Sequence, residues 1–88
     1  MRILIVSNSA KRKLKAFIKK HPEHRVKLEQ IITNLLKNLL QKKIKVHRLS
    51  GKLKFLYAAS ITYEYRLIYF FDDQHVYLIN IGSHDEVY

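Results

Sequence analysis

Hydrophobic residues recur with two different periods along this chain, and the change of period divides it into a helical part and a strand part. Residues 2–6 form a short strand-like segment that is apolar after Arg2, and apolar side chains then recur at three- and four-residue spacing up to about Lys20 and again over residues 26–40. Such spacing places these side chains on one face of a helix. From residue 45 onwards, runs rich in β-branched and aromatic residues alternate with turn residues, which is typical of strands. The pattern predicts one strand, two helices and then three to four strands.

The boundaries of the two helices carry recognisable capping chemistry. Ser7-Asn8-Ser9 offers side-chain oxygens to the free amide groups at the start of the first helix. Pro22 ends that helix because proline disfavours the helical conformation of the residue before it, His21. Proline also suits the first turn of a following helix. We therefore expect a two-helix hairpin that packs against a sheet.

The second helix has a wide apolar stripe, which we expect to form core and in part to remain open for another chain. The stripe consists of Val26, Leu28, Ile31, Ile32, Leu35, Leu36, Leu39 and Leu40.

Short turns separate the strand-like segments, residues 45–49, 53–62, 65–71 and 76–81. Short connections imply an antiparallel meander. The predicted fold class is α+β: an N-terminal strand, a two-helix hairpin and an antiparallel meander of three to four strands, with the helices packed on one sheet face. The last segment has the composition of a strand buried on both faces. Gly82 follows it and is expected to let the chain leave the sheet.

Length and composition predict one small domain, residues 1–88. The absence of cysteine excludes disulfides and thiolate metal sites, and it fits a reducing compartment. The apolar run at the N-terminus is too short for a signal sequence or a membrane span. We therefore expect a cytoplasmic protein without a membrane partner.

Charge is distributed very unevenly along the chain, whose net charge is +10. Residues 1–54 contain sixteen Lys and Arg and two acidic residues, whereas residues 55–88 contain one base and five acids. Such asymmetry favours a polyanionic partner, most often nucleic acid. The alternative is that the lysines only solvate helix faces.

Arg66 is the first candidate for chemistry, because it is the only base in residues 55–88 and lies in an aromatic and aliphatic strand. Its guanidinium requires an anion, which could be a structural carboxylate such as Glu64 or a bound phosphate. Both possibilities are open from the sequence.

His84 is the second candidate, in a short polar tail that follows the last strand. Imidazole can give or take a proton near neutral pH. A meander places the last strand beside the strand of Arg66, and His47 on an earlier strand could face the same patch. Lys52 and Lys54 at the following turn would add cations.

No metal-ligand pattern is evident in the sequence. His21 and His24 are three residues apart, but no carboxylate or cysteine joins them as a set. We interpret both, with His75, as surface residues, and expect neither a metal nor another cofactor.

Three sequence pieces together resemble the RelE/ParE toxin superfamily, and within it the YafQ-like branch of ribosome-dependent mRNA endonucleases. The pieces are His47-x-Leu49-x-Gly51-x-Leu53-Lys54, Tyr65-Arg66-Leu67-Ile68-Tyr69 and Ile81-Gly82-Ser83-His84-Asp85-x-Val87-Tyr88. The resemblance extends over the whole chain in the order of its elements and implies two helices packed on a small antiparallel sheet.

The resemblance also implies residue roles. His84 matches the C-terminal catalytic histidine, Tyr88 matches the aromatic residue that closes the tail, and Arg66 matches the strand arginine that contacts phosphate. His47 falls where relatives place a histidine or glutamate base, and Glu64 falls where the YafQ-like branch has an acid. Arg48, Lys52 and Lys54 are the expected RNA- and phosphate-binding residues.

The implied function is that of the toxin of a type II toxin–antitoxin pair, a metal-independent endoribonuclease that cleaves mRNA on the ribosome. Its implied partners are a cognate antitoxin, the ribosome and mRNA. Ala58 and Ser60 depart from the branch, which can have aspartate and histidine there, and Phe55 stands where glycine is common. Two alternatives remain: a ParE-like non-nuclease that binds a protein target such as gyrase, and a catalytically weak RNA-binding member of the fold.

Overall fold

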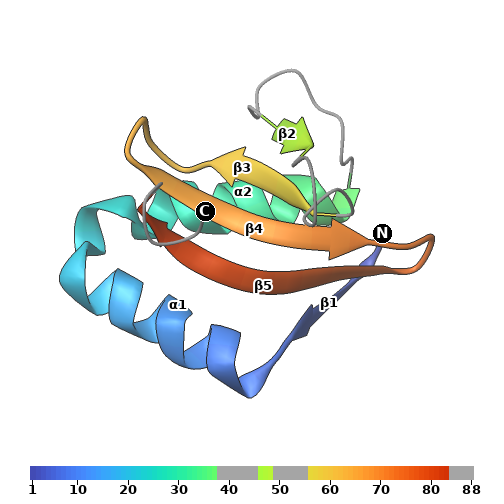
Figure 1. Ribbon diagram of the computed structural model, residues 1–88, viewed down its shortest axis with the longest axis horizontal. Helices are drawn as coiled ribbons and strands as arrows, with labels where there is room; N and C mark the ends of the chain where they lie inside the picture. Colours follow the sequence, from blue (N-terminus) through green and yellow to red (C-terminus); the bar gives the residue numbers. More distant parts are fainter. Residues whose placement is uncertain (38–45, 49–55, 84–88) are drawn as a thin grey trace.

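Two α-helices and five strands make up the part of the chain that the computed structural model describes, which is residues 1–37, the backbone of 46–48, and 56–83 (Figure 1). In chain order they are β1 (Ile3–Val6), α1 (Asn8–Lys20), a 3₁₀ turn η1 (Pro22–His24), α2 (Arg25–Lys37), β2 (Val46–Arg48), β3 (Tyr57–Ser60), β4 (Tyr65–Phe71) and β5 (His75–Ser83).

The strands form one mixed sheet in the order β1-β5-β4-β3-β2. β2, β3, β4 and β5 are antiparallel neighbours, whereas β1 pairs in parallel with β5. The α+β prediction, with a helical hairpin followed by a meander, is therefore confirmed. The parallel pairing of β1 places the N-terminal strand at the edge of the sheet next to the last strand.

The helical hairpin has the predicted caps. Ser7 is the N-cap of α1, and its Oγ accepts a hydrogen bond from the Ala10 amide at 3.1 Å. α1 ends at Lys20, and the amide of His21 donates to the carbonyl of Phe17 at 2.8 Å. Pro22 then begins η1 rather than α2 itself, because the chain first makes a 3₁₀ turn.

Both helices contribute apolar side chains to a core on one face of the sheet. Phe17 comes from α1, and Leu28, Ile31 and Leu35 come from the stripe of α2. Burying side chains of this size stabilises the fold by roughly 1.5–3 kcal/mol each. Val26, at the start of the stripe, is 65% exposed and lies outside this core. Leu39 and Leu40 lie outside the described residues.

Tyr69 is fully buried among these side chains and is excluded as an acid–base group. Burial, with a smaller contribution from the charge of Tyr57, raises the pKa of Tyr69 well above its usual range. Its hydroxyl makes no hydrogen bond to any residue that the structure describes. The phenol is therefore neutral at physiological pH.

The last strand corrects two predictions. β5 is not buried on both faces: Val76, Leu78 and Ile81 are buried, but Ile79 is 38% exposed. The apolar run suggested burial on both faces, but the described helices cover only one face of the sheet. The ladder also shifts between the pairs Ile68–Asn80 and Tyr69–Leu78, so Ile79 is the extra residue of a bulge.

Gly82 does not release the chain from the sheet. It pairs with Arg66, and Ser83 still pairs with Tyr65, so β5 continues two residues beyond the predicted end. The antiparallel ladder with β4 persists because β4 has partners available as far as Tyr65. The prediction that the chain leaves the sheet at Gly82 is wrong.

The β4–β5 turn is closed by one carboxylate. Oδ1 of Asp72 accepts hydrogen bonds from the amides of Gln74 at 2.8 Å and His75 at 2.7 Å, and Oδ2 accepts one from the Tyr77 hydroxyl at 3.1 Å. These bonds, chiefly that from the Gln74 amide, lower the pKa of Asp72 to about 2. The ionised form is therefore the one that closes the turn.

Replacing Asp72 by alanine should lower the melting temperature at neutral pH and remove part of the acid sensitivity. A carboxylate whose pKa falls on folding stabilises the protein above its unfolded pKa, and this contribution is lost as the pH falls from about 4 to about 2. The melting temperatures of the two proteins, followed by circular dichroism, should converge over that range. Asp73→Ala is the matched control, because no described residue bonds that carboxylate. A difference that stays constant down to pH 2 would contradict the assignment.

None of the helices in the described ranges is both long enough and apolar enough to cross a membrane.

Candidate functional site

Arg66 is held against the turn between β3 and β4. Its Nη1 donates to the carbonyl of Thr62 at 2.9 Å and to that of Tyr63 at 3.1 Å. Arg66 forms no ion pair with any described residue, including Glu64. The carboxylate partner considered from the sequence is therefore not observed. One nitrogen of the guanidinium positions the group, and the contacts with described residues do not use Nε or Nη2.

The turn that holds Arg66 is itself ordered by a threonine. Thr62 Oγ1 accepts hydrogen bonds from the amides of Glu64 and Tyr65, both at 3.2 Å. This turn, ordered by the Thr62 side chain, leaves Glu64 exposed at the end of β3 and β4, two residues before Arg66. The carboxylate and the guanidinium thus lie at the same end of the molecule without pairing.

The strand pairing also shows where the predicted residues His47 and Arg48 lie in the sheet relative to Arg66. Arg66 lies between Ser60 on β3 and Gly82 on β5. His47 is opposite Ala58, two residues from Ser60 along β3, and Arg48 is opposite Tyr57. Side chains of β2 are not described.

The remaining predicted residues, Lys52, Lys54, His84 and Tyr88, lie outside the described ranges. His84 follows Ser83 directly in the sequence, and Ser83 pairs with Tyr65, the neighbour of Arg66. The chain therefore reaches His84 from the end of the sheet at which Arg66 is anchored.

A groove of about 420 Å³ runs between α1 and the last residues of β5. It exists because β1 pairs only with residues 75–78 of β5, so beyond Leu78 that edge faces α1 instead of a strand. Lys13, from α1, crosses it and donates to Oδ1 of Asn80 at 3.0 Å. The charged and polar lining residues are Lys13, Lys20, His21, Glu64, Tyr65, Asn80 and Ser83.

Lys13 and Lys20 were not predicted as site residues, although the sequence contains a signal for them. With Phe17 they recur at spacings of four and three, which puts them on one helical face. What the sequence lacked was the neighbour of that face. Only the sheet order shows that α1 lies beside the end of β5 that leads to His84.

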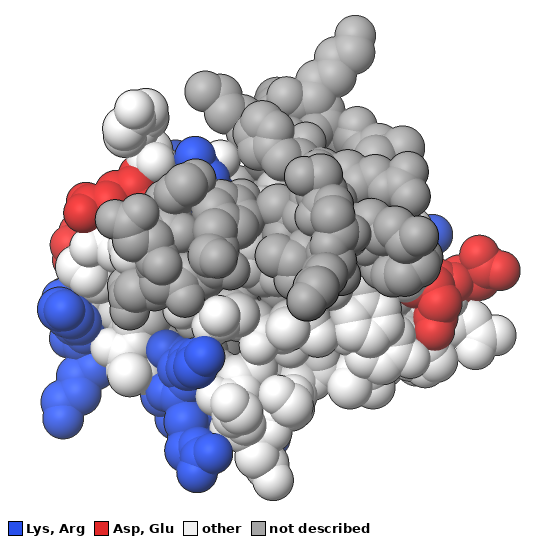
Figure 2. Space-filling model, viewed as in Figure 1, with Lys and Arg blue, Asp and Glu red and all other residues white. Residues whose placement is uncertain are grey.

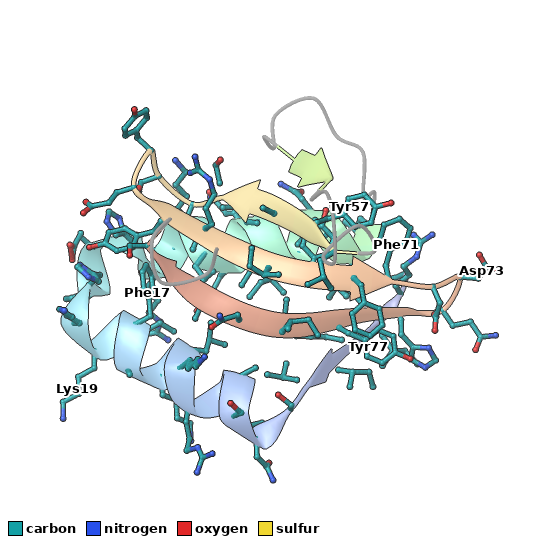
Figure 3. All side chains as sticks on the ribbon, viewed as in Figure 1. Phe17, Lys19, Tyr57, Phe71, Asp73 and Tyr77 are labelled. Carbon is teal, nitrogen blue, oxygen red and sulfur yellow. The ribbon has the colours of Figure 1, made fainter. Side chains whose placement is uncertain are left out.

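An aromatic cluster joins the end of α1 to the start of β4. The ring of Tyr65 lies 4.7 Å from that of His21 and 5.2 Å from that of Phe17, centroid to centroid. Figure 3 shows Phe17 pointing from α1 toward the sheet, whereas Lys19 points away from it. The cluster fixes one end of the groove.

The environment of His21 and His24 differs from the prediction that no carboxylate accompanies them. Glu23 Oε2 lies 3.7 Å from His21 Nδ1 and 4.0 Å from His24 Nε2. The reason is the 3₁₀ turn, in which residues three apart eclipse one another and bring the two imidazoles to the same side as Glu23.

Positive charge is concentrated on α1, which contains six Lys and Arg and no acid. Figure 2 shows basic side chains gathered over α1; acidic side chains form one group at the β4–β5 turn and a second group on the left, near the end of α1. Because the groove borders α1, an anionic ligand would meet a positive potential there.

Comparison with known proteins identifies relatives over the whole chain. Residues 3–88 match the family model described as bacterial toxin of type II toxin–antitoxin system, YafQ. No curated protein matches.

Several solved structures of toxins are similar to this chain. The YafQ chain of the E. coli DinJ–YafQ toxin–antitoxin complex is 26% identical, with 99% of this chain and 97% of that chain covered and a TM-score of 0.84. A metal-bound toxin from Helicobacter pylori is 26% identical, with 100% of both chains covered and a TM-score of 0.82. A YoeB chain from Staphylococcus aureus, a dimer, is 24% identical, with 94% and 97% covered and a TM-score of 0.81.

Proposed function

Because the chain belongs to the YafQ family of bacterial toxins of type II toxin–antitoxin systems, we propose that it is an endoribonuclease that cleaves mRNA on the ribosome. The single observation that carries this proposal is the anchored guanidinium of Arg66. It lies beside the point where the chain continues into His84, and no described carboxylate neutralises it.

A guanidinium held in this way is suited to a phosphate. Its planar fork presents parallel N–H groups to two oxygens of one phosphate, which a flexible ammonium cannot do. The carbonyls of Thr62 and Tyr63 fix its orientation before substrate arrives. Fixed donors stabilise charge that develops on phosphoryl oxygens without reorganising during the reaction.

The proposed reaction uses the 2′-hydroxyl of the substrate as nucleophile. A base removes the 2′ proton as the 2′-oxygen bonds to phosphorus, the bond from phosphorus to the 5′-oxygen breaks, and an acid protonates that oxygen. The products are a 2′,3′-cyclic phosphate and a 5′-hydroxyl. We assign His84 as the acid and His47 or Glu64 as the base, with Arg66 and Lys54 binding the phosphate and Tyr88 stacking on a base.

The partners proposed for this chain are the ribosome, mRNA and a cognate antitoxin. Its relative YafQ forms a toxin–antitoxin complex with DinJ, which supports the last of these. Arg48 and Lys52 are proposed to add to the RNA-binding surface. Like the basic face of α1, they would contact phosphates of ribosomal RNA or mRNA.

The proposal is tested by adding the purified chain to a defined message that is being translated by purified ribosomes. We expect cuts within the reading frame, mapped by primer extension, and no cuts in the same message without ribosomes. An intact message under translation, with inhibition of gyrase instead, would assign the chain to the non-nuclease alternative.

Changing Arg66 to lysine should lower the rate of cleavage about 100-fold or more, because the ammonium keeps the charge but loses the bidentate fork. Single-turnover cleavage on stalled ribosomes measures this directly. Since Arg66 also anchors the β3–β4 turn, the melting temperature of the variant is recorded alongside. Thr62→Ser, which keeps the hydroxyl that orders this turn, is the matched control and should retain cleavage. A folded Arg66→Lys variant of normal rate would contradict the role of the guanidinium.

The double change Lys13→Gln, Lys20→Gln should weaken ribosome binding and flatten its dependence on salt. Each phosphate contact contributes about 0.7–0.9 to the slope of log affinity against log salt, so losing two contacts lowers the slope by roughly 1.4–1.8. Lys15→Gln, Lys19→Gln is the matched control, because both residues are on α1 but outside the groove. Equal changes of slope in both variants would show that only the total charge matters.

A further inference from the structure

Three side chains that can bind a metal ion converge at the corner between α1 and α2. One ligand atom each of His21, Glu23 and His24 lies within 4.8 Å of the other two. The carboxylate oxygen is central, at 3.7 Å and 4.0 Å from the two ring nitrogens. Donors around a tetrahedral ion with bonds of about 2.0–2.2 Å are roughly 3.4 Å apart. Small side-chain rotations would therefore bring all three into coordination distance.

The backbone that carries these ligands is fixed. The amide of His21 donates to the carbonyl of Phe17 at 2.8 Å, and the amide of His24 donates to the carbonyl of His21 at 3.0 Å. Pro22 lies between the two histidines, and its ring fixes its own backbone φ angle. The site would thus lose little backbone entropy on binding an ion.

The two imidazoles are also held from the side by aromatic packing. The His21 ring contacts Tyr65 at 4.7 Å and Phe17 at 5.1 Å, and the His24 ring stacks on that of Phe17 at 6.2 Å. Their side chains are 19% and 24% exposed, whereas Glu23 is 59% exposed. The pocket is therefore walled on the core side and open toward solvent, which leaves a fourth position for water.

We propose that His21, Glu23 and His24 form a binding site for a divalent transition-metal ion. Two imidazoles and one carboxylate match the donors of zinc, copper and nickel, whereas calcium and magnesium prefer oxygen alone. Glu23 supplies the negative charge. Arg25, the next residue, has its own charge offset by Glu29 at 3.2 Å, so it opposes the ion less than an unpaired arginine would.

The bound ion would fasten η1 and, through the contact between His21 and Tyr65, the start of β4. This ion is separate from the nuclease chemistry proposed above, which uses no metal. Its expected effect is on the stability of the hairpin corner.

Isothermal titration of the full chain with ZnCl₂ tests the site. We expect one ion per chain and a melting temperature that rises by several degrees in excess zinc, since the ion binds the folded form. Glu23→Gln and His24→Gln should each weaken binding roughly tenfold or more. His75→Gln, which changes a partly exposed imidazole that pairs with Asp72 at the far turn, is the matched control and should bind normally.

The location of the ion is checked by nickel in place of zinc. Paramagnetic nickel should broaden the imidazole NMR signals of His21 and His24 first, a readout that needs no variant to fold. Affinity unchanged in both Glu23→Gln and His24→Gln would overturn the proposal. So would loss of binding in the double variant His47→Gln, His84→Gln, because the ion would then lie at the proposed nuclease site.

Discussion

Replacing His84 by alanine is expected to abolish mRNA cleavage and growth arrest while leaving the fold intact. A general acid in the transition state contributes about 100- to 10,000-fold to the rate, and loss of the imidazole leaves the departing 5′-oxygen to be protonated by water. The residue follows Ser83 at the end of β5, outside the described core. Single-turnover cleavage and circular dichroism of the purified variant measure the two parts of the prediction.

The matched control for this experiment is His75→Ala. His75 is an imidazole on the same strand, but it pairs with Asp72 at the β4–β5 turn, at the other end of β5 from Ser83. That variant should remain toxic. Co-expression of the neighbouring small open reading frame, the expected antitoxin, should rescue growth in both the wild type and this control. A folded His84→Ala variant that still arrests growth would remove His84 from the mechanism.

Local signals in the sequence were sufficient for most of the fold. The hydroxyl of Ser7 and the ring of Pro22 act within one turn of the chain, so the limits of α1 follow from near neighbours alone. β4 is predicted to the residue, because turn residues flank it on both sides. Elements defined by local chemistry were therefore predictable.

Properties that depend on distant partners were not predictable. The apolar run of β5 does not reveal that the described helices lie on one side of it, so the exposure of Ile79 was missed. Gly82 was interpreted from its conformational freedom, yet pairing with Arg66 decided its conformation. The parallel pairing of β1 with β5, which leaves the groove beside α1, is likewise set by tertiary contacts.

The candidate site shows the same division. Arg66 was conspicuous as a lone base in an apolar strand, but its bonds to the Thr62 and Tyr63 carbonyls depend on the turn geometry. Lys13 and Lys20 looked like ordinary helix surface until the sheet order placed β5 beside them. No carboxylate was expected to join His21 and His24 as a set, because spacing alone does not show that a 3₁₀ turn begins at Pro22 and brings Glu23 beside them.

Substitution of the 2′-hydroxyl at the scissile nucleotide by 2′-methoxy is expected to abolish cleavage. The proposed nucleophile is then absent, and no residue of the proposed site substitutes for it. A message carrying one 2′-methoxy group at a mapped cut site, compared with the unmodified message on the same ribosomes, gives the measurement. The neighbouring cut sites of the same message serve as the internal control and should still be cut.

Cleavage should also survive EDTA at a concentration that leaves the ribosomes intact. A two-metal nuclease needs several carboxylates around one site, and the acids in the described part of this chain are dispersed. Asp72 closes a turn, Glu29 pairs with Arg25, and Glu23 lies between two histidines at the hairpin corner. Near Arg66 the described residues offer only Glu64. EDTA would lower the melting temperature if the corner site holds an ion, but it should not change the rate of cleavage.

The ends of the product fragments decide between the two possible nucleophiles. Attack by the 2′-hydroxyl leaves a 2′,3′-cyclic phosphate, or the 3′-phosphate formed from it, upstream and a 5′-hydroxyl downstream. Attack by water activated on a metal would usually leave a 5′-phosphate. Labelling of the downstream fragment by polynucleotide kinase without prior phosphatase treatment detects the 5′-hydroxyl. A 5′-phosphate, or a cut at the 2′-methoxy position, would show that water attacks and that the imidazole and guanidinium groups assigned above serve another step.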